Sequence, residues 1–278
     1  MTCENGGVHC TKHEGAGNDF LVVLDPDDTL RLSADQIRLL CHRHRGIGAD
    51  GVIRVGPGRA GAQVAMQLHN ADGGEAEMSG NGIRCLAQAA VDAGLVTPPT
   101  FLVATAGGVR TVTFVAGDDP GRARASADMG AVQLGPEMAP IDGRRACRAD
   151  VGNPHLVLLG SGVAEVDVAG RGPELESTRA GGVNVEWIEL GHDAEGDFLE
   201  LRVWERGAGE TLACGTGSVA AAAVARAWGL VTGRGPVRVH NPGGMLEVTL
   251  GAGTGDPAVL AGPVRKVADI EVHAGMLS

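Results

Sequence analysis

The chain has 278 residues, enough for two domains at roughly 150 residues each, and 44% of its residues are hydrophobic. This composition supports a packed core and excludes a wholly disordered protein. The formal net charge of −11, with no run of Lys or Arg, argues against nucleic acid and against a membrane surface as partners.

In chain order, the first half opens with a β-branched run at 20–24 and an amphipathic helix at 34–45. Ser33 is the expected N-cap of this helix, with Gln36 completing a capping box, and Gly46 is expected to end it. A second helix, at 80–93, is closed by Gly94. Strands are predicted at 20–24, 52–55, 63–69, 101–104 and 109–115.

The second half repeats this mixture of strands with one apolar helix. The helix spans 215–228, ends before Gly229 and, like the helix at 80–93, is small and apolar on nearly every side. Such helices are buried on most faces. Short turns between the strands favour hairpins. Strands are predicted at 156–159, 183–190, 198–204, 237–240 and 245–250.

The two halves align when the chain is shifted by 135 residues. The shared pattern is E-x-x-x-[S/C]-G-x-G, then an Ala-rich run, then G-L-V-T, which begins at Glu75 in one half and Glu210 in the other. We therefore predict an α+β fold of two pseudo-symmetric domains, each a mixed or antiparallel sheet curled around a central buried helix. The expected domains are 1–125, with 268–278 packing back on it, and 126–267.

The six cysteines are scattered, without CxxC spacing, and no apolar leader precedes them, which predicts reduced thiols and a cytoplasmic protein. The uncharged, apolar-looking stretch at 212–225 is too short to span a bilayer. No spacing typical of metal ligands occurs, and the G-x-G-x-x-G at 46–51 follows a helix, which is the reverse of the dinucleotide-binding order. No metal and no cofactor are expected.

The repeated element places Ser79 and Cys214 at the starts of the two buried helices. Free N–H groups at a helix start suit a carboxylate, and the same position is expected to lower the pKa of the Cys214 thiol. Two acid/base groups on opposite faces of a carbon can invert a stereocentre. The alternative is that both residues are plain N-caps and that Gly-x-Gly is a packing device.

Five ordered blocks of the sequence resemble the diaminopimelate epimerases. They are HEGAGNDF (13–20), HNADGGEAEMSGNGIRCLA (69–87), GNPH (152–155), GGVNVE (181–186) and ERGAGETLACGTG (205–217). The resemblance runs through most of the chain. It implies a cofactor-independent, PLP-independent isomerase that interconverts LL- and meso-2,6-diaminopimelate in lysine and peptidoglycan biosynthesis, and that commonly forms a homodimer.

The resemblance also implies a role for individual residues. Cys214 matches one catalytic thiol, and Ser79 stands where the family has the other. Glu205 and Arg206 match a pair that holds the amino and carboxylate groups of the substrate. The remaining substrate-binding candidates are Asn18, Asn70, Asn153 and Asn184, with Gly80, Asn81, Gly215 and Thr216 as donors at the two helix starts.

Ser79 is the main departure from the family pattern, because a hydroxyl is a far weaker acid than a thiol. Cys85 is six residues further along the same helix and is not expected to replace it. Gly51 is a second departure, since many relatives have a polar residue there. Three interpretations of Ser79 stay open: an engineered Cys→Ser change, a natural epimerase in which the hydroxyl is active, and a relative with another activity.

The other activities considered are racemisation of a different amino acid and dehydration of hydroxyproline. A non-enzymatic alternative is a catalytically impaired form that still binds the ligand. The expected partner in every case is a small amino-acid substrate, with diaminopimelate favoured.

Overall fold

The computed structural model describes residues 7–233, 235–253 and 255–277. The chain forms two compact units: unit 1 is Met1–Ala127 with Gly262–Ser278, and unit 2 is Asp128–Ala261. The chain therefore enters unit 2 close to the predicted residue 126 but returns to unit 1 at Gly262, earlier than the predicted residue 268. The reason is that one long strand, β17 (Pro257–Val272), belongs to unit 2 at its start and to unit 1 for the rest of its length.

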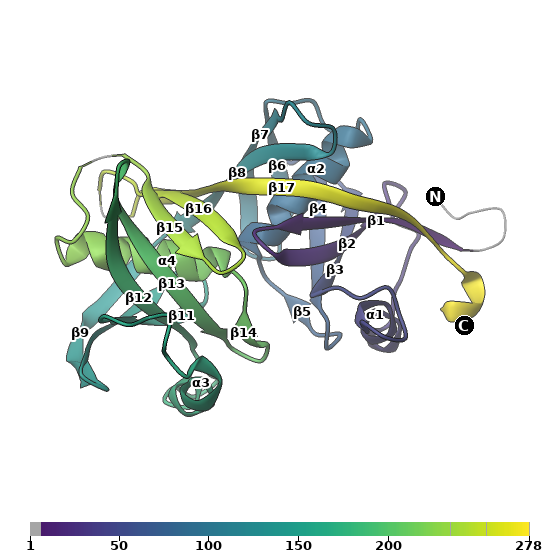
Figure 1. Cartoon of the computed structure of the whole chain (residues 1–278). Coiled ribbons are helices and arrows are strands. Elements are labelled where there is room, and N and C mark those ends of the chain that lie inside the picture. Colours follow the sequence, from purple (N-terminus) through teal and green to yellow (C-terminus); the bar gives the residue numbers. More distant parts are fainter. Residues whose placement is uncertain (1–6, 234, 254, 278) are drawn as a thin grey trace. The chain divides into compact units, whose positions relative to one another are not determined.

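Unit 1 is a mixed sheet with two helices (Figure 1). Its strands pair in the order β17–β1–β2–β3–β4–β6–β7–β8, with the short β5 on β4. The elements are β1 (Val8–Gly15), β2 (Asn18–Leu24), α1 (Ala34–Cys41), β3 (Gly51–Pro57), β4 (Val64–Asn70), β5 (Glu75–Ala76), α2 (Gly80–Asp92), β6 (Thr100–Thr105), β7 (Gly108–Ala116) and β8 (Arg122–Ala131).

Unit 2 has the same architecture. Its strands pair in the order β9–β10–β11–β12–β13–β15–β16–β17, with β14 on β13. The elements are β9 (Gln133–Ile141), β10 (Arg144–Asp150), β11 (Pro154–Leu159), α3 (Val168–Glu176), β12 (Asn184–Asp193), β13 (Gly196–Glu205), β14 (Gly209–Thr211), α4 (Gly215–Ala227), β15 (Val237–Asn241) and β16 (Gly244–Thr249). The short 3-10 helix Ala274–Met276 follows β17 and belongs to unit 1.

The internal repeat predicted from the sequence is confirmed by the strand pairing. In each unit one pair of strands is parallel across a helical connection (β2–β3 and β11–β12), and so are the strands that flank the central helix (β4–β6 and β13–β15). All other described pairs are antiparallel in both units. The sheet is therefore mixed, and the hairpins expected from the short turns make up most of it.

A buried helix lies within the sheet of each unit, as predicted (Figure 1). α2 contacts β1, β2, β3, β4 and β7, and α4 contacts six strands from β10 to β16. Every residue of α4 from Gly215 to Ala225 is buried. Small side chains allow this close approach, since a bulky face would hold the strands away from the helix axis.

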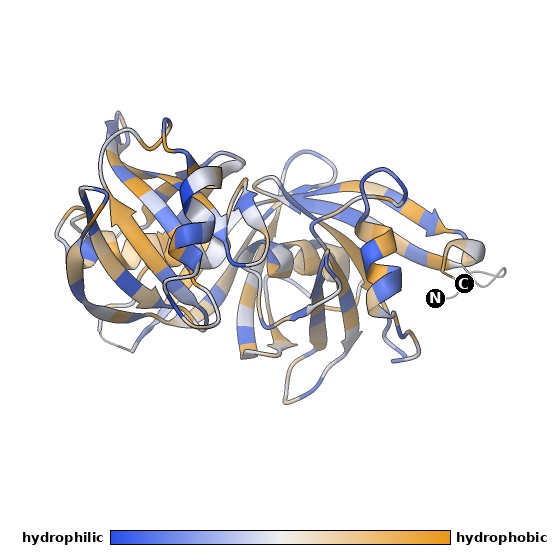
Figure 2. Ribbon diagram, turned by 90° about the horizontal axis from the view of Figure 1, so that it is seen from below, coloured by the Kyte–Doolittle hydropathy of each residue, from blue (hydrophilic) through white to orange (hydrophobic). Residues whose placement is uncertain are grey.

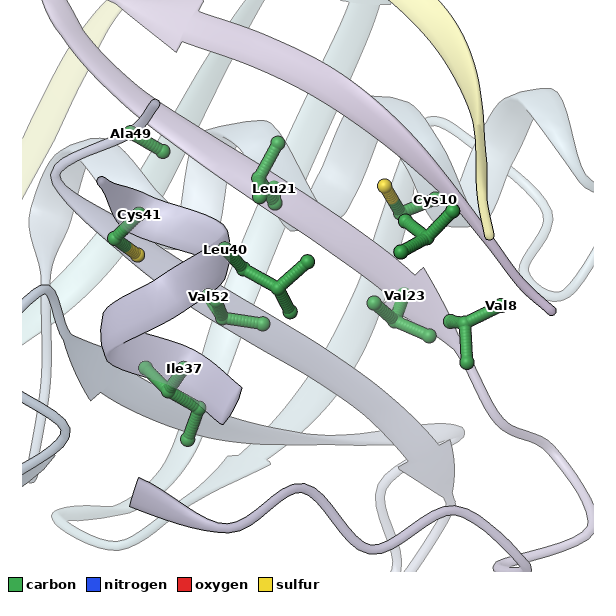
Figure 3. Packing of buried hydrophobic residues seen from close by; sticks show 10 residues of the cluster. Val8, Cys10, Leu21, Val23, Ile37, Leu40, Cys41, Ala49 and Val52 are labelled. Atoms are coloured by element: carbon green, nitrogen blue, oxygen red, sulfur yellow. The ribbon is translucent and has the colours of Figure 1, made fainter. Parts of the chain in front are cut away.

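α1 covers a separate hydrophobic cluster in unit 1. Its residues Ile37, Leu40 and Cys41 lie over Leu21 of β2 and Val52 of β3 (Figure 3). The capping box between Ser33 and Gln36 is present as predicted. Figure 2 shows hydrophobic segments alternating with hydrophilic ones along the strands, as expected for sheets with one buried face.

The predicted helix 34–45 is too long at its C-terminal end. The helix stops at Cys41 because His42 has an extended backbone, with ψ of 115°. Gly46 then crosses the end of the helix, where a Cβ would lie 1.9 Å from the carbonyl oxygen of Leu39. His44 consequently lies in the turn that follows the helix.

The described cysteines agree with the prediction of reduced thiols. Cys10, Cys41, Cys85, Cys147 and Cys214 are free and buried, and Cys3 lies outside the described residues. Within the ranges that the structure describes, no helix is long and apolar enough to cross a membrane.

Candidate active site

Ser79 caps the central helix of unit 1. It has an extended backbone (φ −138°, ψ 121°), and its Oγ accepts a hydrogen bond from the Gly82 amide at 3.0 Å. A Cβ on Gly82 would lie 3.1 Å from Cδ1 of Ile53 and 3.2 Å from Cε of Met66. The hydroxyl is thus held at a helix start that packs closely on aliphatic side chains.

Cys214 caps the central helix of unit 2 in the same way. Its backbone is extended (φ −116°, ψ 118°), and its Sγ accepts from the Gly217 amide at 3.3 Å. Sγ also lies 3.4 Å from Oγ1 of Thr216. The two candidate acid/base residues therefore occupy equivalent positions with the same local geometry, each followed by amides that can bind an anion.

The expected lowering of the Cys214 pKa is wrong for this structure. Burial and the nearby carboxylates of Glu205 and Glu186 raise the pKa of the thiol well above its usual value, and these effects outweigh the donors of Thr216 and Gly217. Burial also raises the pKa of Glu205, to which the Cys214 thiol is hydrogen-bonded. These effects favour the neutral form of the Cys214 thiol.

At two positions beside the helix start, unit 2 has titratable side chains where unit 1 has apolar ones. In unit 2, His155 Nδ1 lies 2.6 Å from Glu186 Oε1, and both side chains are fully buried. The strand register shows which residues of unit 1 are equivalent to these two. Phe20, which pairs with Gly51, is equivalent to His155, which pairs with Asn184. Ile53, the partner of Val22, is equivalent to Glu186, the partner of Val157. The two halves therefore share a backbone but differ in electrostatics.

An asparagine contacts the helix start in each unit. Asn18 Oδ1 accepts from Nδ2 of Asn81 at 3.2 Å, and Asn153 Nδ2 donates to Oγ1 of Thr216 at 3.3 Å. Both pairs join equivalent positions of the repeat. The structure thus brings Asn18, Ser79, Gly80 and Asn81 together in unit 1.

The remaining candidates of unit 2 form a second linked group. Asn184 Oδ1 accepts from the Arg206 amide at 2.9 Å, and its Nδ2 donates to the Pro154 carbonyl at 3.0 Å. The adjacent Glu205 accepts from Thr211 and from the Cys214 thiol. The guanidinium of Arg206, an exposed residue, donates to the Gly181 carbonyl. Glu205 thus links this group to Cys214, beside which Asn153, Gly215 and Thr216 also lie.

Asn70 and Gly51 lie at the ends of the paired strands β3 and β4. Asn70 is exposed, and its backbone bonds Gly74 and Gly73 in a turn. A Cβ on Gly51 would lie 2.5 Å from the His69 carbonyl oxygen and 3.2 Å from the Phe20 ring. This backbone leaves no room for a side chain at position 51.

Sequence reasoning missed four polar residues that bond or face these candidates. His155 and Glu186 stand in blocks that carried the family resemblance, but nothing in the sequence showed that they are paired. The others, Asp50 and Arg84, hold Asn18 and Asn81. Contacts between neighbouring strands depend on register, which single-sequence periodicity does not give.

Comparisons with solved structures define the class of protein. A phenazine biosynthesis protein of the PhzF family from Bacillus anthracis matches with a TM-score of 0.75 at 14% identity, covering 96% of this chain and 99% of that one. A probable proline racemase from Agrobacterium radiobacter K84 matches with a TM-score of 0.72 at 18% identity, covering 95% and 92%. By fold, the chain thus falls into the structural class of these two proteins.

Sequence comparisons define the family within this class. The profile described as Diaminopimelate epimerase matches residues 10–135 and 147–267. The diaminopimelate epimerase of Acidovorax ebreus is 36% identical over 294 residues, which cover 95% of this chain and 97% of that protein. That of Chromobacterium violaceum is 38% identical over 283 residues, covering 95% and 98%. The chain belongs to the diaminopimelate epimerase family, whose members are isomerases.

Proposed function

We propose that this chain interconverts LL- and meso-2,6-diaminopimelate by removing the α-proton from one face and returning a proton to the other. The observation that carries the proposal is the pair of equivalent helix starts, capped by Ser79 and Cys214, in a chain of this family. The amides that follow each cap suit the substrate's α-carboxylate and stabilise the negative charge that develops as the proton leaves. Lysine and peptidoglycan biosynthesis is the corresponding role.

The electrostatics of unit 2 support a thiolate that forms only when substrate is bound. Glu205 raises the pKa of the Cys214 thiol. An α-ammonium group held by Glu205 neutralises this carboxylate and lowers the thiol pKa. The thiol then loses its proton to solvent, and the Cys214 thiolate takes the α-proton while the C–H electron pair stays on carbon. The opposite face receives a proton from Ser79, whose oxygen regains one from solvent before the next turnover.

Ser79 sets the rate in this scheme, because its hydroxyl is a weak proton donor and a weak base. The substrate ends are held by Asn18, Asn70, Asn153 and Asn184, with Arg206 on a carboxylate.

We also propose a cytoplasmic location and a homodimer, which cell fractionation and analytical ultracentrifugation would test.

The test is α-proton exchange in D2O, followed by NMR and chiral chromatography for both diaminopimelate isomers. We expect exchange with slow inversion in the unaltered chain, and a rise of tenfold or more in the inversion rate for Ser79→Cys, since a thiol is the better proton donor. Ser218→Cys, a buried serine of α4 outside the cap, is the matched control. No exchange in either isomer, and none after Ser79→Cys, would exclude the epimerase.

A further inference from the structure

Asn18 and Asn81 stand inside a continuous chain of hydrogen bonds within unit 1. Arg84 Nη2 donates to Asn81 Oδ1 at 2.9 Å, Asn81 Nδ2 donates to Asn18 Oδ1 at 3.2 Å, and Asn18 Nδ2 donates to Asp50 Oδ2 at 2.6 Å. Arg43 completes it, donating to Asp50 Oδ1 at 2.9 Å. This series of hydrogen bonds therefore starts at the Arg84 guanidinium, passes through the two asparagine amides and ends at the Asp50 carboxylate, which also binds the Arg43 guanidinium.

The charges at the two ends fix which way both amides point. A carboxylate accepts and a guanidinium only donates, so Asn18 must turn its NH2 to Asp50, and Asn81 must turn its oxygen to Arg84. Reversing either amide would put two donors or two acceptors face to face. Hydrogen bonds to charged groups are also stronger than those between neutral groups.

Both anchors are themselves firmly held. Arg84 is fully buried on α2, where it also donates to the Gly80 carbonyl at 2.8 Å, and no carboxylate pairs with it among the described residues. Burial lowers the pKa of Arg84 only to about 10, so it remains a cation at neutral pH. Asp50 is fixed by its backbone as well, because its backbone N–H donates a hydrogen bond to the Asp19 carbonyl at 2.9 Å.

Unit 2 shows that the backbone alone does not determine this orientation. At the equivalent position, Asn153 turns its Nδ2, not its oxygen, to the helix start, and its oxygen faces His155 Nε2 at 2.9 Å. Val219 occupies the position equivalent to Arg84. The two asparagines that face the helix starts therefore present opposite ends of the amide, and a different anchor sets each one.

From these contacts we propose that Asp50 and Arg84 are positioning residues, which lock the Asn18 amide so that its second N–H and its free lone pair meet the substrate at fixed places. The inference rests on the proposed function in one respect, namely that Asn18 binds the substrate. Neither anchor needs to touch the ligand, because each acts through an amide.

Asp50→Asn tests the proposal with little change in side-chain size. The carboxylate accepts from both Arg43 and Asn18, whereas an amide has a single acceptor oxygen. Residue 50 therefore loses its hydrogen bond with either Asn18 or Arg43. We expect KM for LL-diaminopimelate to rise about tenfold, the loss of one charge-assisted hydrogen bond, with kcat changed less than about threefold.

The matched control is Asp25→Asn. Asp25 also accepts from an arginine, Arg54 at 2.7 Å, and from two backbone amides, but it lies outside the chain of amides. The Asp25→Asn substitution should lower the thermal midpoint and leave KM unchanged. An equal rise of KM in both variants, or none in Asp50→Asn, overturns the proposal.

Two further measurements separate this inference from the proposed function. The Asn18 side-chain amide signal in a 15N NMR spectrum, assigned by its loss in Asn18→Ala, should shift in Asp50→Asn even if the protein turns over no diaminopimelate, and an unmoved signal overturns the proposal. The double variant Asn18→Asp/Asp50→Asn restores one amide and one carboxylate. It should recover the thermal midpoint without recovering KM, because residue 18 then has no N–H to offer, and a recovered KM overturns the proposal.

Discussion

At the scale of single residues, Cys214 and Ser79 differ more than their shared geometry suggests. The thiol lies beside two carboxylates, whereas the Gly82 that holds the hydroxyl packs against aliphatic side chains. A helix start favours a thiolate by lowering the thiol pKa, but burial and nearby negative charge raise this pKa, and for Cys214 the second effect is larger. The residue types of the site were predictable from motifs, whereas the neighbours that determine their protonation come from other strands.

In the absence of substrate, iodoacetamide should alkylate Cys214 slowly at neutral pH. The reactive form is the thiolate, so the alkylation rate should rise only above pH 9. Glu205→Gln removes a negative charge, lowers the thiol pKa and should shift the rate profile to lower pH. Mass spectrometry of the peptide that contains Cys214 measures it. Glu210→Gln, a carboxylate paired with Arg202, is the control, and equal profiles for the two variants would contradict the assignment.

At the scale of elements, the sequence predicted best where local signals are strong. The central helices have a cap, Gly-x-Gly and a closing glycine, and most of the predicted strands are β-branched runs between turns. α3 (Val168–Glu176) was missed because two glycines and Pro173 disfavour a helix, which Asp167 caps and burial of Leu175 stabilises. β1 and β17 were missed because charged residues interrupt their apolar pattern, and pairing with each other holds them in place.

The element-scale prediction compares two equivalent glycines at the third position of α2 and α4. In Gly82→Ala the new methyl group meets Ile53 and Met66, whose flexible ends can move, and alanine favours the helix. In Gly217→Ala it lies 2.7 Å from Oε1 of the buried Glu186. We expect the first change to alter the free energy of unfolding by less than about 1 kcal/mol, and the second to lower it by about 2 kcal/mol. Urea unfolding of both variants tests the difference, and equal effects would show that the two helix starts are packed alike.

At the scale of the whole molecule, buried thiols should limit stability in alkaline solution. Burial raises the pKa of Cys10, Cys41 and Cys85 to about 12. In the unfolded chain these thiols ionise near their usual pKa of 9.0, so above that pH the unfolded state binds fewer protons than the folded state, and stability falls. Each such thiol lowers the free energy of unfolding by about 1.4 kcal/mol per pH unit between the two pKa values.

The composition makes this effect measurable. The chain has no Tyr and only two Lys, Lys12 and Lys266, so thiols are the main groups of the unfolded chain that titrate between pH 9 and 11. Arg84, whose pKa is lowered to about 10 in the folded protein, acts in the opposite direction above that pH. Below pH 8 the thiols should contribute no pH dependence to the thermal midpoint. From pH 9 to 10.5 the midpoint should fall steeply. Cys85→Ala removes one buried thiol and should reduce the slope, whereas Lys266→Arg should leave it unchanged. A midpoint that stays level to pH 10.5, or a slope that Cys85→Ala does not reduce, would show that these thiols ionise within the folded protein.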